Sequence, residues 1–260
     1  MGMLNDVLEV QETESENGAN DSILVEMMQA GVHYGHKKSK TNPKMKPYIF
    51  GVRSDIELID LNATLEALDK AVNFLKEIKA KGGMILLVAV QPAARETILR
   101  LAEKFNYPYV INRWLGGTLT NFKVIRKRTE YFQQLKKDKE AGTLDKYTKK
   151  ERLKISENID KMKILFSGLE ALTRLPDAVV VVDINLHDTA VREVRRLKIP
   201  VVALVHTDAD PTQINYPIPA NDNAKSSIDW ILKRIESEIE KVQTIPAAVP
   251  DNQQEPQSIK

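Results

Sequence analysis

The chain has 260 residues, no cysteine and a formal net charge of +2. This length allows one large domain or two modest ones around an apolar core. The absence of cysteine excludes a disulfide framework, a catalytic thiol and thiolate zinc sites, and it fits a reducing, cytoplasmic location. The longest apolar run, Met84 to Val90, is far shorter than the ~18 residues of a membrane span, so no membrane partner is expected.

Charge is unevenly distributed along the chain. The first 22 residues contain six acids and neither Lys nor Arg, so the remainder is clearly basic. Secretory and organelle-targeting segments are basic, and we therefore predict that residues 1–21 form a disordered acidic tail and not a targeting signal. Residues 244–260 are rich in Pro and Gln and predict a second disordered tail.

The first predicted elements lie on either side of a basic loop. An amphipathic helix is predicted from Ile23 to Gly31, with Met27 and Met28 turned into the core. A strand from Asp55 to Asp60 follows the loop. It leads into a long helix from Thr64 to Lys79, where apolar residues recur every three to four positions.

The loop itself, residues 37–53, contains six cations and no acid. Pro43 and Pro47 oppose helix formation, and Tyr48 and Phe50 place aromatic rings beside the cations. An extended, basic and aromatic segment suits the backbone and bases of RNA. The alternative is a solvated basic loop ahead of a strand.

Two βαβ patterns predict a parallel sheet covered by helices on both faces. The first comprises the strand Met84–Val90, the helix Ala93–Phe105 and the strand Tyr109–Ile111. The second comprises the strand Ala178–Asp183, the helix Thr189–Leu197, the strand Pro200–Val205 and a closing helix from Asn223 to about Val242.

Between these units, residues 121–172 carry no strand signal. Apolar residues are spaced by alternating steps of four and three from Ile155 to Leu169, which predicts an antiparallel coiled-coil hairpin turning near Gly142 to Thr148. The hairpin is strongly basic, although a solvated helix face accounts for many of its lysines. The segment Arg113 to Arg128, which leads into it, sets a Trp and two glycines among cations just after a strand.

Several motifs occur in a specific order: AGVHYGH from Ala30, NPKMKPYIFG from Asn42, RWLGGTLTNFK from Arg113, LPDAVVVVD from Leu175, and PANDNA from Pro219. In these motifs the chain resembles the bacterial-type small-ribosomal-subunit protein two family. The resemblance implies a flavodoxin-like α/β fold with a protruding coiled-coil hairpin, which agrees with the periodicity. We expect a discontinuous body over residues 22–120 and 173–243 and a hairpin over residues 121–172.

The resemblance also implies a function: a structural constituent of the small ribosomal subunit, bound to its rRNA and supporting assembly and translation. It implies neighbouring ribosomal proteins as partners, among them the large first protein of the subunit, which would dock on this chain. No cofactor and no small-molecule substrate are required. The residues expected to contact RNA are Lys37, Lys38, Lys44, Lys46, Arg53, Arg113, Trp114, Asn121, Lys123, Arg126 and Lys127.

One side-chain set is compatible with a structural divalent metal. His36, His206 and Asp222 lie in loops that could converge on one edge of the sheet, and two imidazoles with a carboxylate suit such an ion without cysteine. The competing interpretation, which we favour, is a hydrogen-bond network that locks the loops together. The family pattern commonly has Asp where this chain has His206, so an acidic site shared by relatives would be altered here.

A doubly wound sheet is also typical of nucleotide-binding enzymes, and this alternative is tested by its motifs. No GxGxxG and no GxxxxGK[ST] sequence occurs in the chain. The best catalytic-looking cluster is Asp183 with His187 and Asp188, but Asp188 is also well placed as a helix N-cap and no nucleophile accompanies it. The sequence therefore predicts a binding protein without catalysis.

Overall fold

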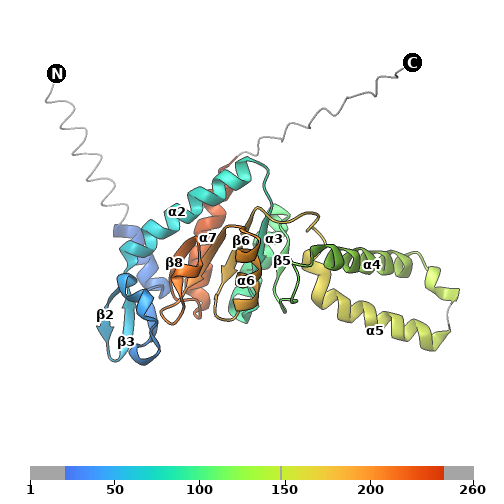
Figure 1. Cartoon of the computed structure of the whole chain (residues 1–260), viewed down its shortest axis with the longest axis horizontal. Coiled ribbons are helices and arrows are strands. Elements are labelled where there is room, and N and C mark those ends of the chain that lie inside the picture. The colour runs from blue at the N-terminus through green and yellow to red at the C-terminus, as the bar shows by residue number, and fades with distance from the viewer. Residues whose placement is uncertain (1–20, 147, 243–260) are drawn as a thin grey trace, which may run out of the picture.

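The computed structural model describes residues 21–146 and 148–242. Both predicted tails lie outside these residues, apart from Asp21. Figure 1 shows an α/β body from which a pair of helices, α4 and α5, protrudes at one end, while the strands β2 and β3 lie at the other end. Within the described ranges, no helix combines the length and apolar character needed to cross a membrane.

A five-stranded parallel sheet forms the centre of the body. Its strands pair in the order β5-β4-β6-β7-β8. When the five strands are renumbered along the chain with β4 as strand 1, this order is 2-1-3-4-5. This is the flavodoxin-like arrangement, so the predicted α/β fold class is confirmed. The strands are β4 (Ile85–Val88), β5 (Tyr109–Val110), β6 (Ala178–Val182), β7 (Val201–Val205) and β8 (Tyr216–Pro219).

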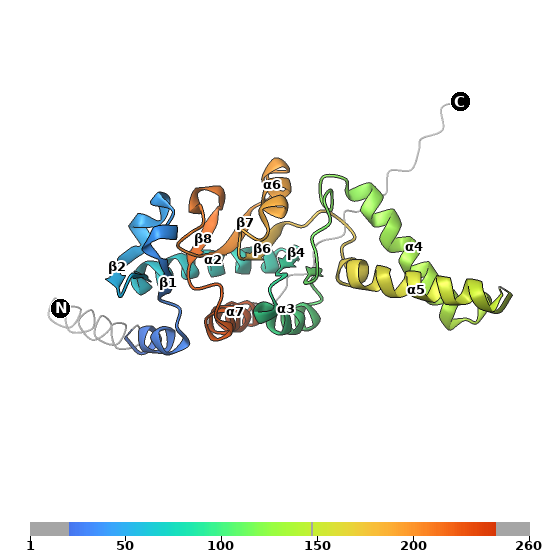
Figure 2. The same cartoon turned by 90° about the horizontal axis from the view of Figure 1, so that it is seen from below.

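Alternate residues of each strand pack into two separate cores on opposite faces of the sheet, because successive side chains of a strand point to opposite faces. Ile85, Leu87 and Val180 belong to the core beneath three helices, and Leu86 and Val179 belong to the core on the opposite face. The helices of the first core are α2 (Leu61–Ala80), α3 (Pro92–Phe105) and α7 (Lys225–Glu240), whereas α6 (Asp188–Arg196) covers the other face. Figure 2 shows α6 and α7 on opposite sides of the strands.

The strand β8 was absent from the prediction. Two of its four residues, Pro217 and Pro219, have no backbone N–H to donate to a neighbouring strand. Proline is therefore read from sequence as evidence against a strand, and β8 was missed. The structure places it at the edge of the sheet, where one side of the strand needs no partner.

A second, three-stranded antiparallel sheet carries the basic loop. It pairs β1 (Tyr34–Lys37), β3 (Ile56–Ile59) and β2 (Ile49–Arg53) in that order, and only β3 had been predicted. The expectation that Pro43 and Pro47 exclude a helix was wrong, since the 3-10 helices η1 (Lys38–Lys40) and η2 (Pro43–Tyr48) interrupt the loop. Pro43 occupies the first helical position, where its missing N–H is not needed.

The first helix, residues 21–30, lies against the same core as α2 and α7. Met27 is fully buried as predicted, but Met28 is 55% exposed, so its expected place in the core was wrong. The helix ends at Gly31, whose φ of 74° is left-handed, and the Val32 amide donates to the Met27 carbonyl at 3.1 Å.

The protruding pair consists of α4 (Phe122–Glu140) and α5 (Lys149–Phe166), with the 3-10 helix η3 (Thr143–Lys146) between them. Phe132 and Ile159 pack in one apolar cluster with Phe166, which joins the pair to the body. A capping box at Thr148 and Glu151 begins α5. The helical hairpin thus forms where expected, while its description as a coiled coil stays a prediction. The remaining short helices are η4 (Ser167–Leu169) and η5 (Pro211–Gln213).

Glu193 of α6 fastens the segment that leads into the hairpin. Its Oε1 accepts from the Trp114 indole N–H at 3.1 Å and from the Gly117 amide at 2.7 Å. Its Oε2 accepts from the amides of Leu119 and Thr120, each at 3.1 Å. Burial works to raise the pKa of Glu193, but the donors of Trp114, Gly117, Thr120 and Leu119 outweigh it and hold the pKa below its usual range.

We predict that Glu193→Ala lowers the free energy of unfolding by about 3 kcal/mol, because several buried donors lose their acceptor together. Urea unfolding followed by circular dichroism measures the change. Glu130→Ala is the matched control, since Glu130 forms an exposed pair with Arg126, and it should cost no more than about 0.5 kcal/mol. Equal losses in both variants would show that Glu193 does not fasten this segment.

Candidate nucleic-acid interface

The basic loop, residues 37–53, presents its cations to solvent. Met45 is fully buried beneath it, and the Asn42 amide donates to the Thr207 carbonyl at 2.9 Å, so the loop is fixed to the body. Phe50 is 80% exposed beside the cations. Five of the cations make no ion pair within the described part of the chain: Lys37, Lys38, Lys40, Lys46 and Arg53.

Lys44 differs from the other cations of the loop. Its Nζ donates to Asp210 at 2.7 Å and to the Thr212 hydroxyl at 3.1 Å. The hydrogen bond from Lys44 is the largest cause that lowers the pKa of Asp210. A phosphate would therefore have to compete with an existing carboxylate for Lys44, which makes this residue the weakest candidate of the loop.

The second predicted group lies at the base of the hairpin. Arg113 is exposed, and Trp114 is half-buried with its N–H held by Glu193, which assigns the indole a packing role irrespective of any RNA contact. Arg126 donates to Glu130 and to the Thr173 carbonyl, each at 2.9 Å. The remaining predicted residues are exposed: Asn121, Lys123 and Lys127.

The two groups are not brought together by the fold. The basic loop adjoins β2 and β3 at one end of the body, and the hairpin helices α4 and α5 extend from the other end (Figures 1 and 2). The predicted residues thus form two separate cationic surfaces, and a single small ligand cannot contact both. Sequence order alone could not show this separation.

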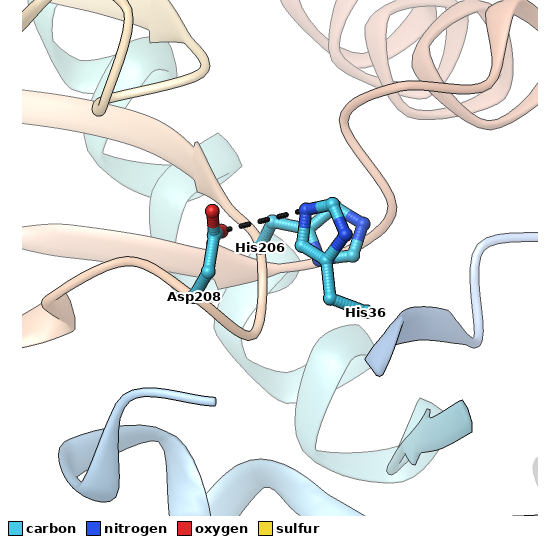
Figure 3. A group of neighbouring side chains, drawn as sticks. All are labelled: His36, His206 and Asp208. Atoms are coloured by element: carbon cyan, nitrogen blue, oxygen red, sulfur yellow. Dashed lines mark ion pairs between the residues drawn. The ribbon is translucent and has the colours of Figure 1, made fainter. Parts of the chain in front are cut away.

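The predicted histidines do meet, but with a different carboxylate. Figure 3 shows His36, His206 and Asp208 as neighbours, with the two imidazoles stacked at a centroid distance of 3.9 Å. His36 Nε2 lies 3.7 Å from Asp208 Oδ1. Within the described ranges, Asp222 is not part of the group, so Asp208 takes the place assigned to it from the sequence.

The hydrogen bonds of His206 do not suit a metal ligand. Its Nδ1 accepts from the Thr207 amide at 2.8 Å, so the proton of the neutral ring is on Nε2. Binding a metal through Nε2 would move that proton to Nδ1, where it would oppose the Thr207 N–H. Burial, and secondarily the neighbouring His36, lowers the pKa of His206 to about 3, so the ring is neutral at physiological pH.

Asp222 is a buried acid near this group and is 4% exposed. Burial raises its pKa to about 8, and the charges of Asp183 and Asp208 act in the same direction. Asp222 is therefore protonated at neutral pH in the folded protein. An unfolded chain would ionise it near its ordinary value of 3.8.

The carboxyl ends of β4 and β6 form the crevice where flavodoxin-like folds bind ligands. Here the groups are bonded to one another: the Val90 amide donates to His187 Nε2 at 3.0 Å, and Gln91 Nε2 donates to Asp183 at 2.7 Å. His187 Nδ1 lies 2.7 Å from the Asp183 carbonyl, and burial, the largest cause, lowers the pKa of His187. Pro92, first in α3, has no N–H to offer a phosphate.

The cluster of Asp183, His187 and Asp188 is therefore accounted for by structure. Asp188 is the first residue of α6 and pairs with Arg192 at 2.7 Å, whereas His187 occupies the cap position that the sequence had assigned to Asp188. Asp183 has a left-handed φ of 66° and accepts from the Leu186 amide at 3.0 Å, which fixes the loop.

Glu193 and Asp208 were not identified from the sequence. The signal for Glu193 was available, because this acid lies within the apolar spacing of Ala190, Val191 and Val194, where only a well-bonded carboxylate is tolerated. Asp208 gave no comparable signal, since its role depends on how three loops meet.

We predict that Asp222→Asn makes stability less dependent on pH. Because the folded-state pKa is raised, the contribution of Asp222 is fully present below pH 4 and is lost as the pH rises toward 8. The variant should therefore melt above the wild type at pH 8, with the difference shrinking as the pH approaches 4. Thermal melts across this range measure it, with exposed Asp69→Asn as control. A pH-independent difference would contradict protonation of Asp222.

Comparisons with known proteins agree with the motifs of the sequence. The sequence matches the family Ribosomal protein S2 over residues 27–241. Small ribosomal subunit protein uS2 of Francisella tularensis subsp. novicida (strain U112) is 40% identical over 228 residues, covering 88% of this chain and 95% of the relative. The uS2 protein of Roseiflexus castenholzii (strain DSM 13941 / HLO8) is 43% identical over 209 residues, covering 80% of each chain. The chain belongs to the ribosomal protein S2 family.

Proposed function

We propose that this protein is a structural component of the small ribosomal subunit, where it binds rRNA and catalyses no reaction. The observation that carries the proposal is the pair of exposed cationic surfaces at opposite ends of the body. In the crevice between them, where other proteins of this fold bind ligands, Val90 is bonded to His187 and Gln91 to Asp183. Membership of a ribosomal protein family supports it. The protein then acts in the cytoplasm, bound to the ribosome.

The rRNA contacts are assigned to the two surfaces described above. In the basic loop, Lys38, Lys46 and Arg53 are free to neutralise phosphates, and Lys37 adds a fourth cation. At the base of the hairpin, Arg113, Asn121, Lys123 and Lys127 provide the second set. Two contacts far apart fit a protein that joins separate rRNA segments.

We assign the protein-docking surface to the apolar patch formed by Phe50 and Val52 of the basic loop with Met28 of the first helix. Phe50 is 80% exposed, Met28 55%, and Val52 49%, and Phe50 and Met28 also line a groove of about 330 Å³ with His33 and Leu61. Exposed aromatic and Met side chains on a rigid sheet are typical of protein interfaces. This patch is where a neighbouring small-subunit protein, such as the large first protein, would dock.

The central test replaces Lys38, Lys46 and Arg53 by Ala. Each lost phosphate contact should flatten the slope of log affinity against log salt by roughly 0.7 to 0.9, and rRNA binding should weaken at low salt. Filter binding of small-subunit rRNA across a salt series measures both quantities.

The matched control replaces Lys70, Lys198 and Lys233, which are exposed cations outside the two surfaces, by Ala. It removes the same net charge and should leave the slope close to that of the wild type. The assignment fails if both triple variants change the slope equally, or if the loop variant leaves it unchanged.

We propose that His36, His206 and Asp208 belong to a network without a resident divalent ion. The network consists of the stacked imidazoles, the 3.7 Å contact of His36 with Asp208, and the hydrogen bonds of Thr207 with His36 and His206. Protein purified without chelator should therefore contain negligible metal by elemental analysis, and so should His206→Ala. If the wild-type protein contained stoichiometric metal and His206→Ala did not, the group would be a structural metal site and the proposal would be wrong.

A further inference from the structure

A cavity of about 340 Å³ opens at the carboxyl end of the sheet, beside the closed crevice. Asn112, Arg113 and Trp114, which follow β5, line one part of it, and Leu186 and Thr189, which flank the start of α6, line another. Its volume lies at the lower end of the range of small-ligand sites. None of the functions assigned above uses it as a site.

The lining is flat and apolar in one part and cationic in another. Trp114 is fixed through its N–H to Glu193, so its ring needs no rearrangement before binding. Leu186 is 55% exposed and adds apolar surface that no other part of the described chain covers. Arg113 is exposed and makes no ion pair with any described residue.

Two residues of the wall offer a phosphate no free donor. Val90 and His187 line the cavity, and the Val90 amide donates to His187 Nε2 at 3.0 Å, while His187 Nδ1 lies 2.7 Å from the Asp183 carbonyl. The charge left for an anion is that of Arg113, which suits one phosphate and not a row of them. A planar, weakly polar group linked to a single phosphate matches this chemistry, and an unstacked nucleotide of RNA has both parts.

We propose that this cavity receives one unstacked base of the small-subunit rRNA, which packs on Trp114 and Leu186 while Arg113 binds its phosphate. The proposal rests on the proposed function and deepens it, since it adds a base contact to surfaces that otherwise bind phosphates. Aromatic side chains stack on any of the four bases with little preference. The contact would therefore position the RNA without distinguishing its sequence.

The two tryptophans of the chain permit a direct test. Trp230 of α7 donates to Glu26 away from the cavity, so Trp230→Phe leaves Trp114 as the sole indole emitter. In this background, single-stranded RNA should quench the Trp114 emission on binding. An abasic oligoribonucleotide of equal length and charge should bind through the cations without quenching. Equal quenching by both, or none by either despite binding, overturns the proposal and leaves rRNA binding intact.

A second measurement does not depend on fluorescence. Thr189→Phe places a bulky ring in the cavity from an exposed position, and it should weaken rRNA binding roughly five- to hundred-fold, as loss of one stacked base does. Ser237→Phe, at an exposed position of α7, is the matched control and should bind as the wild type does. Unchanged affinity in folded Thr189→Phe contradicts the proposal. Saturable quenching by adenosine monophosphate at micromolar concentration would instead indicate a site for free nucleotides.

Discussion

Burial of both faces of the parallel sheet is the constraint on which this structure depends. The strands β6 and β7 are buried at every residue, so polar side chains can approach the sheet only in the loops at its ends. At the carboxyl end two of those loops bond to one another, through His187 with Val90 and through Gln91 with Asp183. A crevice that binds phosphates in other proteins of this fold is here part of the protein's own framework.

Binding surfaces are consequently additions to the sheet. The three-stranded sheet with the basic loop lies at one end and the helical hairpin at the other (Figure 1). Each addition is fixed to the body by buried contacts: Met45 beneath the loop, and Glu193 at the entrance to the hairpin. Rigid anchoring of exposed cations lowers the entropy lost when a polyanion is bound, which suits a protein that holds rRNA segments in place.

Periodicity predicted the long helices and the central strands, because their burial patterns extend over many residues. It failed for β1, β2 and β8, which are short, irregular or rich in proline, and for Met28, whose spacing suits the core but which faces solvent. The basic loop was identified from composition alone. The group of His36, His206 and Asp208, the closed crevice and the opposite placement of the two cationic surfaces arise from tertiary contacts, which no local pattern encodes.

The most direct test of this account is a density map of the small ribosomal subunit that contains this protein. The account predicts rRNA phosphates within ion-pair distance of the basic loop and of the hairpin base, with different rRNA segments at the two surfaces. It also predicts that the crevice between β4 and β6 holds no separate ligand. A map in which both cationic surfaces face solvent, or in which that crevice holds a free nucleotide that is not part of the rRNA, would contradict it.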